Sequence, residues 1–172
     1  MRHGQRSIFL GVVVPAVVLC ALGSLSAAAR PAGAAGVHKA TVAMKEFAFA
    51  PARIELKVGE DVELTLKNEG QVAHDWMVGT DLVNTTQEKG FHKDLLALLK
   101  RKETGKQFTP ERVGVASKTD GIKRISTGVE IEPGGEVRLR FVVPASAKGQ
   151  WDMDCVLTGH YESGMKGAVV IR

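Results

Sequence analysis

The sequence predicts an all-β domain, a sandwich or barrel, that follows an N-terminal leader. Three observations support this fold class. Apolar and polar residues alternate with period two in several short segments from about residue 40 onward. Turn sequences such as 68–70 (Asn-Glu-Gly) and 133–135 (Pro-Gly-Gly) separate these segments. Helix-favouring composition is concentrated near residues 87–101. Seven or eight short strands divided by turns are typical of a β-sandwich or barrel.

The N-terminal segment has the organisation of a secretory signal. Arg2 and Arg6 precede an apolar run from Ile8 to about Leu25, and small residues follow up to Ala35. A charged start, an apolar centre and a small-residue end define such a signal, which we place at residues 1–34. The alternative is an uncleaved membrane anchor, because the apolar run is long.

Removal of this leader changes the charge balance of the chain. Arg2, Arg6 and Arg30 precede Ala34, so 20 of the 23 basic residues remain against 19 acidic ones. The sequence pI of about 9.2 is therefore largely a property of the leader. No basic patch with interleaved aromatic residues is present, so the sequence gives no case for a nucleic-acid partner.

The strands are expected in a regular order along the mature chain. Between residues 62 and 67, Val, Leu and Leu alternate with Glu, Thr and Lys, which places one apolar face on a core and one polar face in water. The same reasoning predicts strands at about residues 41–49, 54–58, 62–66, 75–78, 129–131, 137–143, 151–155 and 167–171.

The segment from about residue 84 to 127 does not follow this pattern. Phe91, Leu95 and Leu98 can share one helical face, so we expect a short helix from about Gln87 to Arg101 and then a polar loop. Between Lys89 and Arg124 there are ten Lys or Arg residues and four acidic ones. Such a run is usually a solvated face, and the alternative is a docking surface for an acidic partner.

The mature chain keeps one cysteine. Because Cys20 lies in the leader, Cys155 cannot form an internal disulfide. A free thiol in an oxidising compartment is protected when it is buried or bound to a metal. Burial alone is the simpler interpretation, since free cysteine is among the most buried residue types.

The residues that follow Cys155 favour the metal. His160 and Met165 lie in the same short segment, and His74 stands far upstream at the edge of an apolar run. Two imidazoles, one thiolate and a weak axial thioether are the donor set of a blue copper site. Each residue has an ordinary alternative, because His74 can be a buried histidine and Met165 can fill the core. His38 and His92 have no such pattern and are expected at the surface.

This arrangement resembles the cupredoxin family, with ligand spacing similar to its rusticyanin-like and auracyanin-like members. The resemblance rests on the pattern Cys-x4-His-x4-Met at residues 155–165, on His74, and on the early segment 47–59 (Phe-x-Phe-x-Pro, then Gly). It implies a cupredoxin-like Greek-key β-sandwich over residues 38–172, with a short helical and loop insertion at about 84–127. It also implies one type 1 copper ion held by His74, Cys155, His160 and Met165, and outer-sphere electron transfer.

Two positions depart from the family pattern. Asp75 follows the first ligand where many members have Asn or Ser, and we expect its carboxylate to accept a backbone hydrogen bond from the Cys155 loop. Thr158 stands in the loop between Cys155 and His160, where members often carry Pro, so this loop is expected to be less stiff.

The predicted function is therefore single-electron transfer by an exported type 1 copper protein, periplasmic or otherwise outside the cytoplasm. The alternative is a copper carrier or chaperone, although the mature chain has no methionine cluster. We expect no enzyme activity, because a multicopper enzyme needs more histidines than the four that remain. The expected partners are redox proteins, the expected state is a monomer, and the N-terminal segment offers a route to membrane association.

Overall fold

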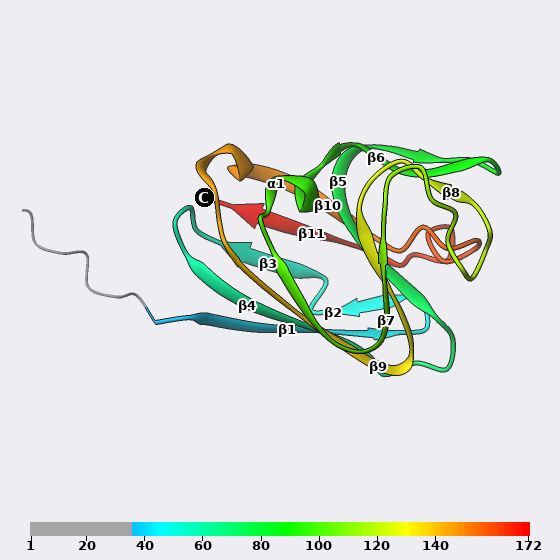
Figure 1. Cartoon of the computed structure of the whole chain (residues 1–172), viewed down its shortest axis with the longest axis horizontal. Coiled ribbons are helices and arrows are strands. Elements are labelled where there is room, and N and C mark those ends of the chain that lie inside the picture. The colour runs from blue at the N-terminus through cyan, green and yellow to red at the C-terminus, as the bar shows by residue number, and fades with distance from the viewer. Residues whose placement is uncertain (1–35) are drawn as a thin grey trace, which may run out of the picture. The chain divides into compact units, whose positions relative to one another are not determined.

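The computed structural model describes residues 36–172, so the predicted signal at 1–34 and the question of its cleavage lie outside the described part. Within it the chain is nearly all β-structure, with one short helix (Figure 1). No helix in this part is long and apolar enough to cross a membrane.

The elements follow one another closely along the chain. The strands are β1 (His38–Lys45), β2 (Ala48–Ala50), β3 (Arg53–Leu56), β4 (Asp61–Asn68), β5 (His74–Asn84), β6 (Glu88–Asp94), β7 (Lys102–Glu111), β8 (Lys123–Arg124), β9 (Gly128–Val142), β10 (Gly149–Asp154) and β11 (Lys166–Ile171). The helix α1 is Leu95–Leu98, and a 3-10 turn spans Ala145–Ala147.

The strands are hydrogen-bonded in the order β2-β1-β4-β9-β5-β10-β11-β3. Strand β9 joins the two halves of this path, because residues 136–142 pair with β4 and residues 128–131 pair with β5. Strand β7 runs along both parts of β9, and β6 extends the sheet from β5 to β8. The all-β expectation is confirmed (Figure 1).

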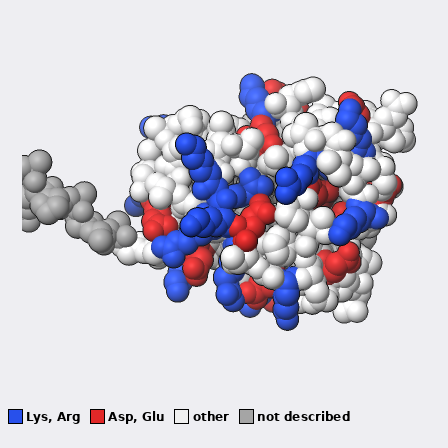
Figure 2. Space-filling view, in the orientation of Figure 1, with Lys and Arg blue, Asp and Glu red and all other residues white. Residues whose placement is uncertain are grey.

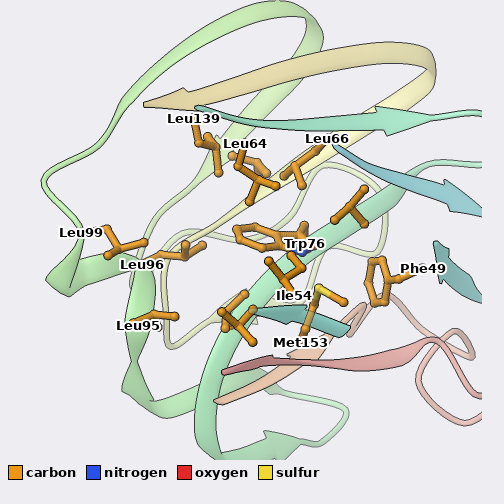
Figure 3. Packing of buried hydrophobic residues seen from close by; sticks show 14 of the residues in the cluster. Phe49, Ile54, Leu64, Leu66, Trp76, Leu95, Leu96, Leu99, Leu139 and Met153 are labelled. Carbon is orange, nitrogen blue, oxygen red and sulfur yellow. The ribbon is translucent and has the colours of Figure 1, made fainter. Parts of the chain in front are cut away.

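The core is built from the apolar faces of the alternating strands. In β4, Val62, Leu64 and Leu66 are buried while their neighbours face outward, as the sequence pattern predicts. Trp76 of β5 lies among leucines from several elements, with Met153 of β10 beside it (Figure 3). Cys155 and Met165 belong to the same buried cluster, so the predicted ligand region rests directly on the core.

One predicted turn is wrong. Pro133-Gly134-Gly135 was expected to separate two strands, but these residues lie inside the continuous strand β9. The backbone bends here, with Gly134 at φ 72°, and β7 opposite shifts register between Lys106 and Phe108. Because β7 pairs with β9 on both sides of the bend, the strand changes partners without being interrupted.

The predicted helix at 87–101 is also wrong in extent. Residues Glu88–Asp94 form β6, which pairs with the long strand β5, and only Leu95–Leu98 are helical. Gly90 has φ 131°, which no helix allows. The side chain of Asp94 accepts a hydrogen bond from the Ala97 N–H (3.0 Å) and caps the single turn. Sheet pairing has therefore overridden local helix propensity, and the segment 84–127 contains β6, β7 and β8 joined by the single helical turn and loops.

The basic run in this segment is not uniformly solvated. Most of its charged side chains face water, and Lys and Arg side chains interleave with Asp and Glu on the surface seen in Figure 2. Arg124 is fully buried, however, and Lys89 is 5 % exposed. For these two residues the expectation of a solvated face is wrong.

Candidate metal centre

A turn between β4 and β5 delivers His74. The side chain of Asn68 donates hydrogen bonds to the Val72 and Ile131 carbonyl oxygens (both 2.8 Å) and accepts one from the Gly70 N–H (2.9 Å). These bonds fix the turn, and β5 then begins at His74, which pairs with Ile131 of β9. The imidazole is consequently buried at the start of a central strand.

The loop from Cys155 to Met165 connects β10 to β11. Its ends are joined, because the Cys155 N–H donates to the Met165 carbonyl oxygen (3.2 Å). Inside the loop, the His160 N–H donates to Leu157 (2.9 Å) and the Met165 N–H donates to His160 (3.1 Å). The compact turns present His160 beside Cys155, as the spacing in the sequence predicts.

Three potential ligand atoms converge at this end of the domain. His160 Nδ1 lies 3.2 Å from Cys155 Sγ and 3.2 Å from His74 Nδ1. The ligand atoms of His74, Cys155 and His160 all lie within 4.8 Å of one another. His74 and Cys155 are fully buried, whereas His160 is partly exposed. The structure thus brings together three of the four predicted ligands across 86 residues of sequence.

Met165, the fourth predicted ligand, is fully buried in the same hydrophobic cluster as Cys155. Its main chain closes the ligand loop through the two hydrogen bonds above. The other histidines of the described part lie elsewhere. His38 pairs with Glu60 (Nδ1 to Oε1, 2.9 Å), and His92 is exposed on β6.

Asp75 ties the two ligand-bearing segments together. Its N–H points to Cys155 Sγ (3.4 Å), and its Oδ1 accepts a hydrogen bond from the Val156 N–H (2.8 Å). The expected bond from Asp75 to the Cys155 loop is confirmed. A backbone donor aimed at a ligand sulfur and a carboxylate that holds the ligand loop are typical outer-shell supports of a metal site.

The protonation states suit metal binding. Burial and the neighbouring His160 lower the pKa of His74 to about 4, and burial, with Lys89, lowers the pKa of His160. Both imidazoles are therefore neutral at pH 7 and have a free lone pair. Burial, aided by the negative Asp75, raises the pKa of the Cys155 thiol well above its ordinary value. The metal-free site thus holds a thiol, whose proton must leave when a metal binds.

The donor set fits a copper ion. Nitrogen and sulfur donors on one transition-metal ion lie about 2.0–2.3 Å from it, and hence about 3.3–3.8 Å from each other. The separations of 3.2 Å here are close to that range. Imidazole and thiolate together accommodate both Cu(II) and Cu(I). Copper bound here would supply a one-electron couple, and the protein residues would fix its surroundings.

Sequence reasoning did not find three residues that support the site. Asn68 holds the turn before His74, and Arg124 and Lys89 contact Asp75 and Thr158, respectively. Local periodicity carries no signal for the two cations, because a charged residue in a polar segment is normally solvated. The Asn68-Glu69-Gly70 turn was recognised as a break, but its role in placing His74 depends on a bond to distant Ile131.

Comparisons with known proteins agree with this geometry. A family model described as "Cupredoxin-like domain" matches residues 15–95, a range that includes His74 and ends before the C-terminal ligand loop. The chain is 26% identical over 175 residues to the "Copper-resistant cuproprotein CopI" of Pseudomonas aeruginosa, covering 96% of this chain and 93% of that protein. It is 27% identical to the protein of the same name from Rubrivivax gelatinosus over 124 residues, 72% of this chain and 59% of that one.

Among solved structures, the fold is similar to auracyanin A, described as a "blue" copper protein, from Chloroflexus aurantiacus. The TM-score is 0.50 at 18% identity, over 80% of this chain and all of that one. At this identity the likeness shows the fold alone, and it agrees with the family model. The chain therefore has the predicted cupredoxin fold, and its residues 15–95 match the cupredoxin-like family model.

Proposed function

We propose that this protein is an exported type 1 copper protein that transfers single electrons between redox partners. His74, Cys155 and His160 would bind one copper ion, and Met165 would be its weak axial ligand. The observation that carries this proposal is the convergence of His74 Nδ1, Cys155 Sγ and His160 Nδ1 on one small buried volume.

The residues around the site would keep it rigid. Asn68 fixes the turn that carries His74, and Asp75 fixes the Cys155 loop to the same strand. An electron carrier works best when its ligands move little between oxidation states, and these bonds oppose such movement. The partly exposed imidazole of His160 connects the site with the surface, where a redox protein could dock.

The remaining parts of the proposal concern the protein's setting. The leader at residues 1–34 would direct export to the periplasm or another compartment outside the cytoplasm, or would anchor the domain to the membrane. The protein would act as a monomer without enzyme activity, and its partners would be redox proteins.

A second function is favoured by the relatives. Two proteins that match most of this chain bear the name copper-resistant cuproprotein, and such a name fits copper sequestration or transfer. In that case the same residues would hold copper as a carrier or chaperone, and electron exchange would be secondary.

The first experiment adds Cu(II) to the purified protein and records visible and EPR spectra. An intense thiolate-to-copper absorption with narrow copper hyperfine splitting is expected. Cys155→Ser should abolish the absorption, whereas His92→Ala, on exposed β6, should leave it unchanged. A colourless copper-loaded protein would refute the type 1 site. Two further measurements then distinguish the functions. Reversible voltammetry supports an electron carrier, and rapid transfer of Cu(I) to a chelator supports a copper carrier.

A further inference from the structure

Arg124 lies at the centre of a buried cluster of charges behind the ligand residues. Its Nη2 contacts Asp75 Oδ2 (3.2 Å), its Nε donates to Glu111 Oε1 (2.8 Å), and its Nη1 reaches Asp120 Oδ1 (3.2 Å) and the Ile122 carbonyl (3.1 Å). The side chains of Arg124 and Asp75 have no exposed surface. A guanidinium in such a setting is held in one orientation by its partners.

The contact with Asp75 bears directly on the ligand loop. One carboxylate oxygen of Asp75 accepts the Val156 N–H, and the other faces Arg124. The two contacts together define the rotation of the carboxylate. Without Arg124, Asp75 Oδ2 would be buried with no opposite charge beside it. Asp75 could then gain hydration only by moving toward water, and that movement would break its hydrogen bond with the Val156 N–H.

A second cation extends the cluster to the loop that follows Cys155. Lys89 of β6 pairs with Arg124 of β8 in register, and its Nζ contacts Asp120 Oδ2 (3.3 Å) and Thr158 Oγ1 (2.9 Å). Asp120 therefore bridges the two cations. Arg124 thus contacts Asp75, the residue after His74, and Lys89 contacts Thr158, which lies between Cys155 and His160.

We propose that Arg124 is a positioning residue of the metal centre and that it acts through Asp75. It holds the carboxylate on the Val156 N–H and balances the charge of that carboxylate beside the copper site. This inference rests on the proposed function. A lone carboxylate near the ion would favour Cu(II) over Cu(I), whereas a carboxylate paired with a guanidinium presents a much weaker field. The pair therefore keeps the potential above the value that Asp75 alone would give.

Glu111 does not replace Arg124 as the balancing group. Burial raises the pKa of its carboxyl group to about 9, and the repulsion of Asp75 adds to the shift while Arg124 opposes it. Glu111 is thus neutral at pH 7, and the charged carboxylates that contact Arg124 and Lys89 are Asp75 and Asp120. Buried Glu130 lies nearby but accepts hydrogen bonds from Ser117 and Thr119 instead. Removing either member of the Asp75–Arg124 pair leaves one charge uncompensated, and removing both restores the balance.

The test compares Arg124→Gln, Asp75→Asn and the double variant in the full protein. In Arg124→Gln the ratio of Cu(II) to Cu(I) affinity should rise about tenfold, which lowers the potential by about 59 mV. In Asp75→Asn the potential should rise, and in the double variant it should return toward the wild-type value. Arg140→Gln removes an equally ionic but exposed arginine and should change nothing. A double variant whose potential stays as far from the wild-type value as that of either single variant, or an unchanged potential in Arg124→Gln, would overturn the proposal.

A second readout does not need copper. In the metal-free protein, hydrogen exchange of the Val156 N–H should be at least tenfold faster in Arg124→Gln, relative to core amides of β4 and β9. A merely structural role would accelerate all these amides together, and that result would also overturn the proposal. If the wild-type protein shows no blue copper spectrum, the proposed function fails, but the exchange measurement still tests the role of Arg124.

Arg124→Gln can also fail to fold. The comparison is then between Asp75→Asn and the double variant, in which two neutral amides leave no unpaired charge between positions 75 and 124. The double variant should have the lower potential, because it lacks the guanidinium that Asp75→Asn retains. Equal potentials in these two variants would show that the site does not sense Arg124.

Discussion

Two arginines of this domain make similar contacts in opposite surroundings. Arg140, on β9, binds Asp61 Oδ2 (3.0 Å) and approaches Glu63 (4.0 Å), and half of its side chain is exposed. Arg124, on β8, binds Asp75, Glu111 and Asp120 at 2.8–3.2 Å and is wholly buried. Water screens the charges around Arg140. The buried charges around Arg124 are out of contact with water and are stabilised only by one another. The same residue type thus belongs to a solvated sheet surface in one place and to a buried charge cluster beside the candidate metal centre in the other.

The largest expected difference concerns stability. Arg124→Met leaves Asp75 buried without its partner, so the free energy of unfolding should fall by about 3–5 kcal/mol. Arg140→Met breaks an exposed pair and should cost less than about 1 kcal/mol. Urea unfolding of the metal-free proteins, monitored by tryptophan fluorescence, measures both values. Equal losses in the two variants would show that burial does not distinguish the two regions.

The buried cluster should also give the domain a pH dependence. The pKa of Glu111, raised to about 9 mainly by burial, exceeds its ordinary value of 4.5. The folded protein therefore keeps a proton that the unfolded chain loses, so this contribution to stability is complete below about pH 4.5 and declines as the pH rises toward 9. Where the two states differ by one whole proton, the decline is about 1.4 kcal/mol per pH unit.

Glu111→Gln tests this effect, because the amide stays neutral at every pH. The variant should match the wild type at pH 4.5 and become progressively more stable than it up to pH 9. Urea unfolding of both metal-free proteins at several pH values gives the two curves. Parallel curves would mean that Glu111 is ionised in the folded protein.

The comparison also shows which parts of the molecule could be predicted from the sequence. The alternating pattern of β4 predicts its buried face, because its apolar side chains point into the core and its polar side chains point toward water. The spacing of Cys155, His160 and Met165 predicts a shared loop, because the turn sequences Thr158-Gly159 and Ser163-Gly164 reverse the chain between them. His74 needed the resemblance to a family, since its place beside His160 is decided by folding across 86 residues.

The segment 84–127 could not be predicted in the same way. Its strand β6 contains helix-compatible residues, and it becomes a strand because β5 continues beyond Gly79 and offers an edge. Lys89 and Arg124 are buried because the carboxylates of Asp75 and Asp120 and the carboxyl group of Glu111 surround them. Charge burial depends on partners that lie far away in sequence, and no local pattern records it. The bend of β9 at Gly134 likewise depends on the support of β7.

The smallest expected effect separates two threonines that accept a hydrogen bond from a lysine. Thr158 Oγ1 accepts from the buried Lys89 (2.9 Å), and Thr109 Oγ1 accepts from the exposed Lys118 (3.0 Å). Thr158→Val should destabilise the metal-free domain by about 1 kcal/mol. Buried Lys89 loses the hydroxyl of Thr158, and water reaches Lys89 less easily than it reaches the exposed Lys118. Thr109→Val should have almost no effect, since water can take the place of the hydroxyl.

The same pair of variants links the cluster to the metal. If the Lys89–Thr158 bond steadies the loop between Cys155 and His160, its loss should speed copper transfer to a chelator about fivefold, the factor that corresponds to 1 kcal/mol. Transfer from Thr109→Val should match the wild type. A destabilised Thr158→Val protein with an unchanged transfer rate would restrict the role of this bond to folding.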